Sequence, residues 1–164
     1  MVEGLERFNG LPEEAAVAEL LAVCHSRRWA ERVAAGRPYP DLAALRAAAD
    51  ELWMELDPAD WLEALEAHPR IGESGGRSAE WSRQEQAGVG GADAGVRERL
   101  ATGNAEYERR FGHVFLISAA GRDAAEILDA LQARLGNDPE TELRVAAGEH
   151  RRITRLRLER LVAT

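Results

Sequence analysis

The sequence predicts an all-α protein, a single-domain helical bundle with one short extended segment near residues 114–119. Three observations favour this class. Apolar residues recur at intervals of three and four over most of the chain, aspartates stand where helices would begin, and glycines stand where helices would end. The length of 164 residues is typical of one domain with one core, so we expect a single domain spanning residues 1–164.

Five stretches carry the helical spacing, and their apolar positions follow one another along the chain. They are Val17, Leu20, Leu21 and Cys24; Leu42, Leu45, Ala49, Leu52, Trp53 and Leu56; Trp61, Leu62 and Leu65; Val96, Leu100, Tyr107 and Phe111; and Ile127, Leu128, Leu131 and Leu135. Intervals of three and four place the members of each set on one face of a helix.

Capping residues predict several helix boundaries. Four aspartates are placed as N-caps, at Asp41, Asp57, Asp123 and Asp138. The second and fourth are followed by proline, which suits the first helical turn, and Glu126 gives Asp123 the spacing of a capping box. Gly36 and Gly136 are placed to end helices.

Two segments lack the helical period: the Gly- and Ser-rich residues 72–78 and the apolar residues 114–119. The second could be a buried strand, but no other part of the chain offers it a partner. We expect it to be an extended segment threaded between helices, whose backbone amides then need partners. A ligand rich in carbonyls and ureido nitrogens would suit these amides.

Charge and hydropathy exclude several classes of partner. The 29 acidic and 21 basic residues give a net charge of -8, which repels nucleic acid and anionic membrane surfaces. The longest apolar run is too short to cross a bilayer. We therefore expect neither nucleic acid nor a membrane as a partner. We expect a solvated helix face for the basic cluster near the C-terminus, Arg151, Arg152, Arg155, Arg157 and Arg160.

The chemistry of single residue types narrows the function further. Cys24 is the only cysteine and no apolar signal segment follows Met1, so we expect a reducing, cytoplasmic location. Its place on an apolar helical stripe favours packing over nucleophilic catalysis. The chain has no lysine, which excludes a lysine imine and a lysine-bound pyridoxal cofactor.

Neither a metal nor a phosphate site is predicted. The four histidines show no i, i+4 pairing and no cysteine pair accompanies them, so we expect no metal. The glycine-rich residues 88–91 lack the lysine of a phosphate-binding loop, and a break between helices is the better interpretation.

Proton-transfer chemistry is indicated by His68-Pro69 and by residues 82–86. A histidine titrates near neutral pH, although an isolated His-Pro pair more often marks a helix end. If a helix begins at Ser82, then Glu85 and Gln86 share its face with Ser82. Ser82 and Glu85 also have the spacing of a capping box. A capping box does not use Gln86, whereas ligand binding on this face would.

Ordered markers then connect the whole chain to a known family. They are Phe8-Asn9, Arg37-Pro38-Tyr39, His68-Pro69, Ser82-x-x-Glu85-Gln86, Asn104-x-x-Tyr107-x-x-x-Phe111-Gly112, Gly121-Arg122, Arg134-Leu135-x-Asn137, Glu142 and Arg155-Leu156-Arg157-Leu158. With these markers the chain resembles the 2-oxo-4-hydroxy-4-carboxy-5-ureidoimidazoline (OHCU) decarboxylases of urate catabolism. The resemblance implies an all-helical carboxy-lyase that converts OHCU to (S)-allantoin, without a cofactor and usually as a homodimer.

The resemblance also implies a role for each site residue. His68 is expected to be the catalytic acid, oriented by Glu85. The positions expected to bind substrate are Pro69, Ser82, Gln86, Phe115, Ile117, Ala119 and Arg122, the last through the substrate carboxylate. The chain departs from many relatives at His113-Val114, where they have Phe-Pro, and at Ser118, where they have Cys.

Two other functions remain open from the sequence. The chain could be a non-catalytic helical interaction module that keeps the fold, although the intact His68, Glu85 and Gln86 argue against this. It could also be an enzyme on the same scaffold that acts on another ureido compound, because one fold hosts more than one chemistry.

Overall fold

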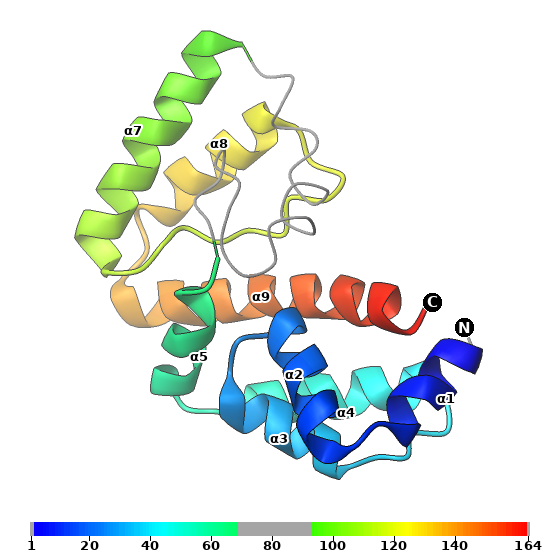
Figure 1. Cartoon of the computed structure of the whole chain (residues 1–164). Coiled ribbons are helices and arrows are strands. Elements are labelled where there is room, and N and C mark those ends of the chain that lie inside the picture. The colour runs from blue at the N-terminus through cyan, green and yellow to red at the C-terminus, as the bar shows by residue number, and fades with distance from the viewer. Residues whose placement is uncertain (1, 69–92, 164) are drawn as a thin grey trace. The chain divides into compact units, whose positions relative to one another are not determined.

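The computed structural model describes residues 2–68 and 93–163, and over these residues it contains eight helices and no strand (Figure 1). The prediction of an all-α fold is confirmed. The helices are α1 (Val2–Gly10), α2 (Glu13–Val23), α3 (Arg27–Ala35), α4 (Leu42–Met54), α5 (Pro58–Leu65), α7 (Ala94–Phe111), α8 (Ala124–Arg134) and α9 (Pro139–Val162). Among the described helices, none combines the length and the apolar character needed to cross a membrane.

The chain divides into two compact units. One comprises residues 1–64 and 151–164, and the other comprises residues 65–150. Helix α9 supplies residues to both units, because its first half belongs to the second unit and its last turns belong to the first. A single domain over residues 1–164 stays a prediction.

The predicted N-caps are confirmed. The side chain of Asp41 accepts a hydrogen bond from the backbone amide of Ala44 at 2.8 Å, and that of Asp57 accepts one from the amide of Asp60 at 3.2 Å. Asp123 forms the complete capping box with Glu126. These bonds satisfy backbone N–H groups that the first helical turn leaves without intrahelical partners, and so fix where the helices begin.

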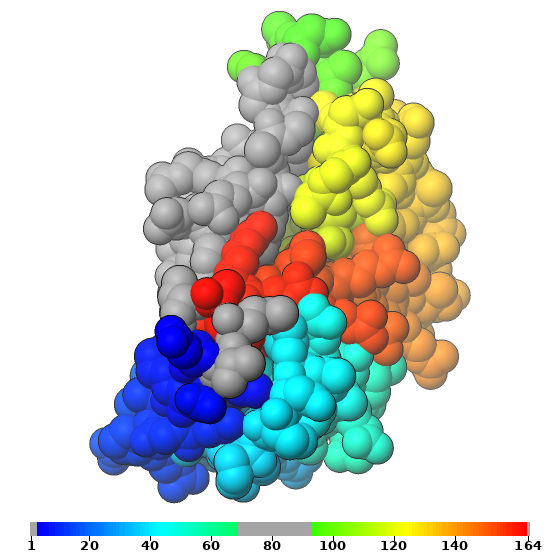
Figure 2. All heavy atoms as spheres, turned by 90° about the vertical axis from the view of Figure 1, so that its right-hand side faces the viewer, coloured from blue at the N-terminus to red at the C-terminus, as the bar shows by residue number. Residues whose placement is uncertain are grey.

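The first unit is held by aromatic packing and by polar contacts between its segments. Trp29 is buried and donates from its indole nitrogen to the carbonyl of Ala49 at 3.0 Å. The Asn9 side chain exchanges two hydrogen bonds, each 2.9 Å long, with the backbone of Tyr39. On the face shown in Figure 2, atoms of the N-terminal residues (blue) lie next to atoms of residues around position 40 (cyan). The family markers Asn9 and Tyr39 therefore serve packing in this unit.

The C-terminal arginines do not form one solvated face, so this expectation is wrong. Arg157 is only 2% exposed, and its guanidinium donates to the carbonyl of Val23 at 3.3 Å. Val23 is the last residue of α2, where carbonyl groups lack intrahelical partners and a cation is favoured. Arg155 pairs with Asp50 of α4. Helix α9 thus uses arginines to attach neighbouring helices.

Cys24 lies outside the helix on whose stripe the sequence placed it. Helix α2 ends at Val23, and Cys24 has an extended backbone conformation. The side chain is nevertheless buried, and this burial raises the pKa of the thiol to about 12. The expectation that Cys24 packs rather than reacts is consistent with this environment, because the thiolate is the reactive form.

The second unit has its core between α7, α8 and the segment that joins them. The buried apolar residues are Leu100, Tyr107, Phe115, Ile117, Ala119, Ala124, Ile127, Leu128 and Leu131. Helices α7 and α8 lie side by side in Figure 1 and contact each other. Gly103 permits their close approach, because a Cβ atom there would lie 2.6 Å from a methyl carbon of Leu131.

Candidate active site

The structure describes part of the predicted site. His68, Phe115, Ile117, Ala119 and Arg122 lie within the described residues, and all of them belong to the second unit. The expected orienting carboxylate, Glu85, and three expected binding residues, Pro69, Ser82 and Gln86, lie outside the described residues. The glycine-rich residues 72–78 and 88–91 also lie outside them.

Residues 114–119 form the predicted extended segment, which is confirmed. Gly112 ends helix α7 with a φ of +80°, and Gly121 has a φ of +79°. Side chains disfavour this left-handed conformation, so both positions suit glycine. The amide of Arg122 bonds the carbonyl of Ala119 at 3.0 Å, which closes a turn around Gly121. The extended segment is therefore bounded by two glycine-dependent changes of direction.

Arg134 of α8 anchors the middle of the extended segment. Its guanidinium donates to the carbonyl of Leu116 at 2.7 Å. The same group forms an ion pair with Glu142 of α9, to which its Nε donates at 2.9 Å and 3.1 Å. Its central carbon also lies 4.6 Å from the ring centroid of Phe115, within cation–π range. One side chain thus fixes both the backbone and a ring of this segment.

Glu142 is fully buried and accepts hydrogen bonds from residues of α7, α8 and the α8–α9 connection. Besides Arg134, it accepts hydrogen bonds from the hydroxyl of Tyr107 and, at 3.1 Å, from the side-chain amide of Asn137. Burial, together with the hydrogen bond to Glu142, raises the pKa of Tyr107 far above its usual range. The hydroxyl therefore remains protonated and continues to donate. The sequence marked these four residues without assigning them a role.

His68 follows the end of α5 and meets a second histidine. Its amide bonds the carbonyl of Leu65, the last residue of α5, at 3.1 Å. The half-buried imidazole lies 4.9 Å from that of His150, centroid to centroid, with the ring planes at 86°. His150 belongs to α9 and is fully buried. Spacing gave no indication of this pair, because the two residues are far apart in sequence.

Arg122 reaches the same part of α9. Its guanidinium pairs with the buried carboxylate of Glu149 at 3.4 Å, and Glu149 directly precedes His150. Two predicted site residues, His68 and Arg122, therefore contact consecutive residues of one helix. A guanidinium has five N–H donors, so its pairing with Glu149 is compatible with binding a second anion.

His113, where the chain departs from many relatives, packs against aromatic residues at the end of α7. Its ring lies edge-on to Tyr107 with a centroid distance of 5.5 Å, and it stacks with Phe111 at 6.3 Å. Its Nδ1 lies 3.1 Å from the carbonyl oxygen of Val114. At this position, therefore, the departure from many relatives places a ring in the aromatic packing at the end of α7.

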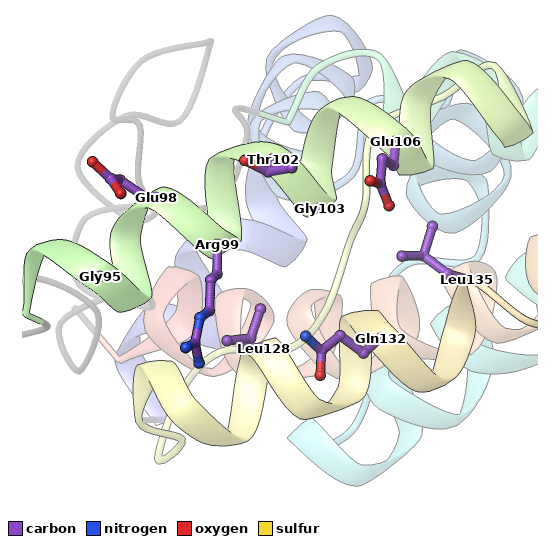
Figure 3. A pocket seen from close by; sticks show the side chains of 9 residues that line it. All are labelled: Gly95, Glu98, Arg99, Thr102, Gly103, Glu106, Leu128, Gln132 and Leu135. Carbon is purple, nitrogen blue, oxygen red and sulfur yellow. The ribbon is translucent and has the colours of Figure 1, made fainter.

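A groove of about 480 Å³ lies between α7 and α8 (Figure 3). In Figure 3, Arg99 extends from α7 toward α8, whereas Glu98 points to the opposite side. The groove is lined by Gly95, Glu98, Arg99, Thr102, Gly103, Glu106, Leu128, Gln132 and Leu135. None of the predicted site residues is among them.

Over residues 2–68 and 93–163, no three histidine, cysteine or acidic side chains gather as a metal site would require.

Comparisons with known proteins agree on one family. A family profile described as OHCU decarboxylase matches residues 9–159. A 2-oxo-4-hydroxy-4-carboxy-5-ureidoimidazoline decarboxylase of Amia calva is 35% identical over 138 residues, which cover 81% of this chain and 79% of that protein. A crystal structure of OHCU decarboxylase in the presence of (S)-allantoin is 32% identical, with a TM-score of 0.80 over 89% of this chain and 98% of that one.

Some relatives are longer than this chain. The uric acid degradation bifunctional protein TTL of Arabidopsis thaliana is 34% identical over 144 residues, covering 84% of this chain but 44% of that protein. The bifunctional protein PucL of Bacillus subtilis matches over 28% of its length. The chain thus spans less than half of these two relatives.

Proposed function

The chain belongs to the OHCU decarboxylase family, and from this premise we propose that it converts OHCU to (S)-allantoin in urate catabolism without a cofactor. The observation that carries this proposal is the approach of His68 and Arg122 to consecutive residues of α9. Both residues thus reach the stretch of α9 at residues 149–150, which supports the proposal that a proton donor and a carboxylate-binding cation serve one site. Decarboxylation followed by protonation needs these two groups.

The reaction breaks the bond between a ring carbon and its carboxylate. Carbon dioxide leaves, and the electron pair of that bond passes into the adjacent ring C=N bond at the ureido-bearing carbon, which leaves the hydroxyl-bearing carbon as an enol. As the enol becomes a carbonyl, the ureido-bearing carbon takes up a proton. Because the substrate supplies its own electron sink, the protein must supply hydrogen bonds to the developing charge and one proton. A carbon–hydrogen bond then forms on one face of the ring, which gives a single enantiomer.

His68 is the proposed proton donor, and Glu85 is proposed to keep its imidazole charged and directed at the reacting carbon. A positioned general acid contributes about 10²- to 10⁴-fold to the rate. Arg122 is proposed to hold the substrate carboxylate before it leaves. Glu149 supports this role, since it holds the guanidinium at the end of the extended segment.

The ureido and ring groups of the substrate are assigned to the remaining predicted residues. The backbone of the extended segment at Phe115, Ile117 and Ala119 would form one wall, and the bond from Arg134 to the neighbouring carbonyl of Leu116 supports a fixed wall. Pro69, Ser82 and Gln86 would complete the pocket. We further propose that the protein acts as a homodimer, which the family resemblance implies, and in the cytoplasm, as the sequence analysis expects.

The test is circular dichroism of freshly generated OHCU, made from urate with urate oxidase and hydroxyisourate hydrolase. With the protein present, optically active (S)-allantoin should accumulate faster than the slow spontaneous decay to racemate. His68→Asn should lose about 100-fold or more of this activity while keeping the helical spectrum. His25→Asn makes the same chemical change in the other unit and should leave activity unchanged.

Two results would contradict the proposal in different ways. Decay at the spontaneous rate with the wild-type protein would favour a non-catalytic interaction module, or an enzyme for another ureido compound. Substrate profiling would separate those two alternatives. Wild-type turnover in a folded His68→Asn variant would instead remove His68 from the mechanism.

A further inference from the structure

We propose that His150 is a positioning residue that fixes the orientation of the His68 ring. This inference rests on the proposed function, because orientation matters only if His68 delivers a proton. It concerns a residue of α9 that belonged to none of the sequence motifs. The rings of His68 and His150 form one contact between the end of α5 and the middle of α9.

The position of His68 makes an external restraint necessary. Helix α5 ends at Leu65, so His68 lies beyond its last helical residue. The side chain is half-buried, and rotation about the bond to a histidine ring has broad preferences. A general acid must nevertheless lie within hydrogen-bond reach of the atom that it protonates. The ring therefore needs contacts that select one orientation.

His150 has the properties of such a restraint. It is fully buried, so its ring cannot turn without displacing close-packed neighbours. It lies inside helix α9, and helices hold side chains more rigidly than loops do. The neighbouring Ala146 and Ala147 are also buried, which indicates that this stretch of α9 is closely packed.

The geometry of the pair is a preferred one. Aromatic rings favour edge-to-face contacts with centroids about 4.5–7 Å apart. The His68–His150 pair, at 4.9 Å and 86°, falls within this class. An edge-to-face contact restricts both the position and the tilt of the partner ring. Because Glu149 holds Arg122 one residue earlier, the same stretch of α9 sets the proton donor and the carboxylate-binding cation together.

The decisive variants are His150→Leu and His150→Phe. Leucine fills most of the space without a flat ring, whereas phenylalanine keeps the ring and its edge. Edge-to-face pairs contribute an amount that corresponds to about 2- to 12-fold in a rate. We expect His150→Leu to lower kcat by about 3- to 10-fold with KM within about twofold, and His150→Phe to restore most of kcat. An unchanged kcat in folded His150→Leu would overturn the proposal.

Nuclear magnetic resonance of the histidine rings gives a second readout that does not depend on activity. The chain has four histidines, so isotope-labelled ring signals can be assigned by single substitutions. In the wild type, ring protons of His68 and His150 should show a mutual nuclear Overhauser effect. His150→Leu should shift the His68 signals and make that ring more mobile, while the signals of His25 in the other unit stay in place.

These readouts separate the two proposals. If the wild type lacks decarboxylase activity, the proposed function fails, and the spectra still show whether His150 restrains His68. If the wild type is active but its two rings show no contact, or His68 is equally ordered in the leucine variant, the positioning role is refuted alone. Should His150→Leu not fold, the wild-type contact and the kinetics of His150→Phe decide the question.

Discussion

Substitution of Glu142 by glutamine gives the most direct test of how the extended segment is held. The change keeps the size of the side chain and removes its charge. In the native protein, the fully buried carboxylate accepts hydrogen bonds from Arg134, Tyr107 and Asn137. A glutamine amide would place an NH2 group against one of these donors, and the buried guanidinium of Arg134 would lose its counter-charge.

The expected cost follows from the burial of the pair. Removing one partner of a buried ion pair typically costs about 3–5 kcal/mol, because the other charge is left uncompensated. For a chain of this length, 1 kcal/mol corresponds to about 2–4 °C in Tm. Glu142→Gln should therefore lower Tm by about 6–20 °C. Much of this loss of stability comes from the buried arginine left without its counter-charge. The double variant Arg134→Met, Glu142→Leu should therefore lose less stability than the sum of the losses in its two single variants.

Glu140→Gln is the matched control, because it makes the same change two residues earlier in α9. Glu140 pairs with Arg144, but its side chain is 78% exposed. Exposed pairs contribute little, so its loss should cost less than about 1 kcal/mol. Urea denaturation and thermal unfolding followed by circular dichroism measure both variants. Equal effects of the two substitutions would refute the reasoning that the buried network holds the extended segment.

Two further predictions concern packing and capping. Gly103→Ala should leave the protein about 1–3 kcal/mol less stable than Gly148→Ala in urea denaturation. Both substitutions raise helix propensity, but only the first forces a Cβ atom toward Leu131. Apart from the helix's own backbone, no described residue lies within 4 Å of a Cβ atom at Gly148. Hydrogen bonds from the amide and hydroxyl of Thr141 lower the pKa of Asp138 below its usual value. The ionised Asp138 therefore stabilises the folded protein above about pH 4, and this stabilisation is lost as the pH falls through the lowered pKa. The stability advantage of the wild type over Asp138→Asn should therefore shrink below about pH 4 in unfolding experiments at pH 3–6, and an advantage that stayed constant would contradict this.

The sequence predicted those features of the fold that depend on neighbouring residues. The N-caps at Asp41, Asp57 and Asp123 were correct because capping is decided within one helical turn. The extended segment was also correct, since an apolar run without the helical period must be buried without being helical. Gly112 and Gly121 then proved to have the left-handed conformation that bounds it.

The features that the sequence missed depend on contacts between distant segments. The charge pattern at the C-terminus suggested solvation for Arg157, but the side chain is buried on the end of α2, more than 130 positions earlier. The pairing of His68 with His150 escaped notice for the same reason. Local spacing carries no information about such contacts. The spacing of the arginines along α9 is the same whether all of them face solvent or one of them is buried, so periodicity cannot identify the buried one.

Helix α9 offers a physical explanation for an extended segment without strand partners in the described residues. Glu142 and Glu149 are seven residues apart, which places them on one face of the helix about 10 Å apart along its axis. Each holds one arginine: Arg134 bonds the middle of the segment at Leu116, and Arg122 is the last residue of the turn that ends the segment. Two buried carboxylates on a rigid helix thus do through side chains what a sheet does through backbone hydrogen bonds. Backbone groups that are not used in a sheet can then face a ligand, and this is the property that a binding wall of residues 115–119 requires.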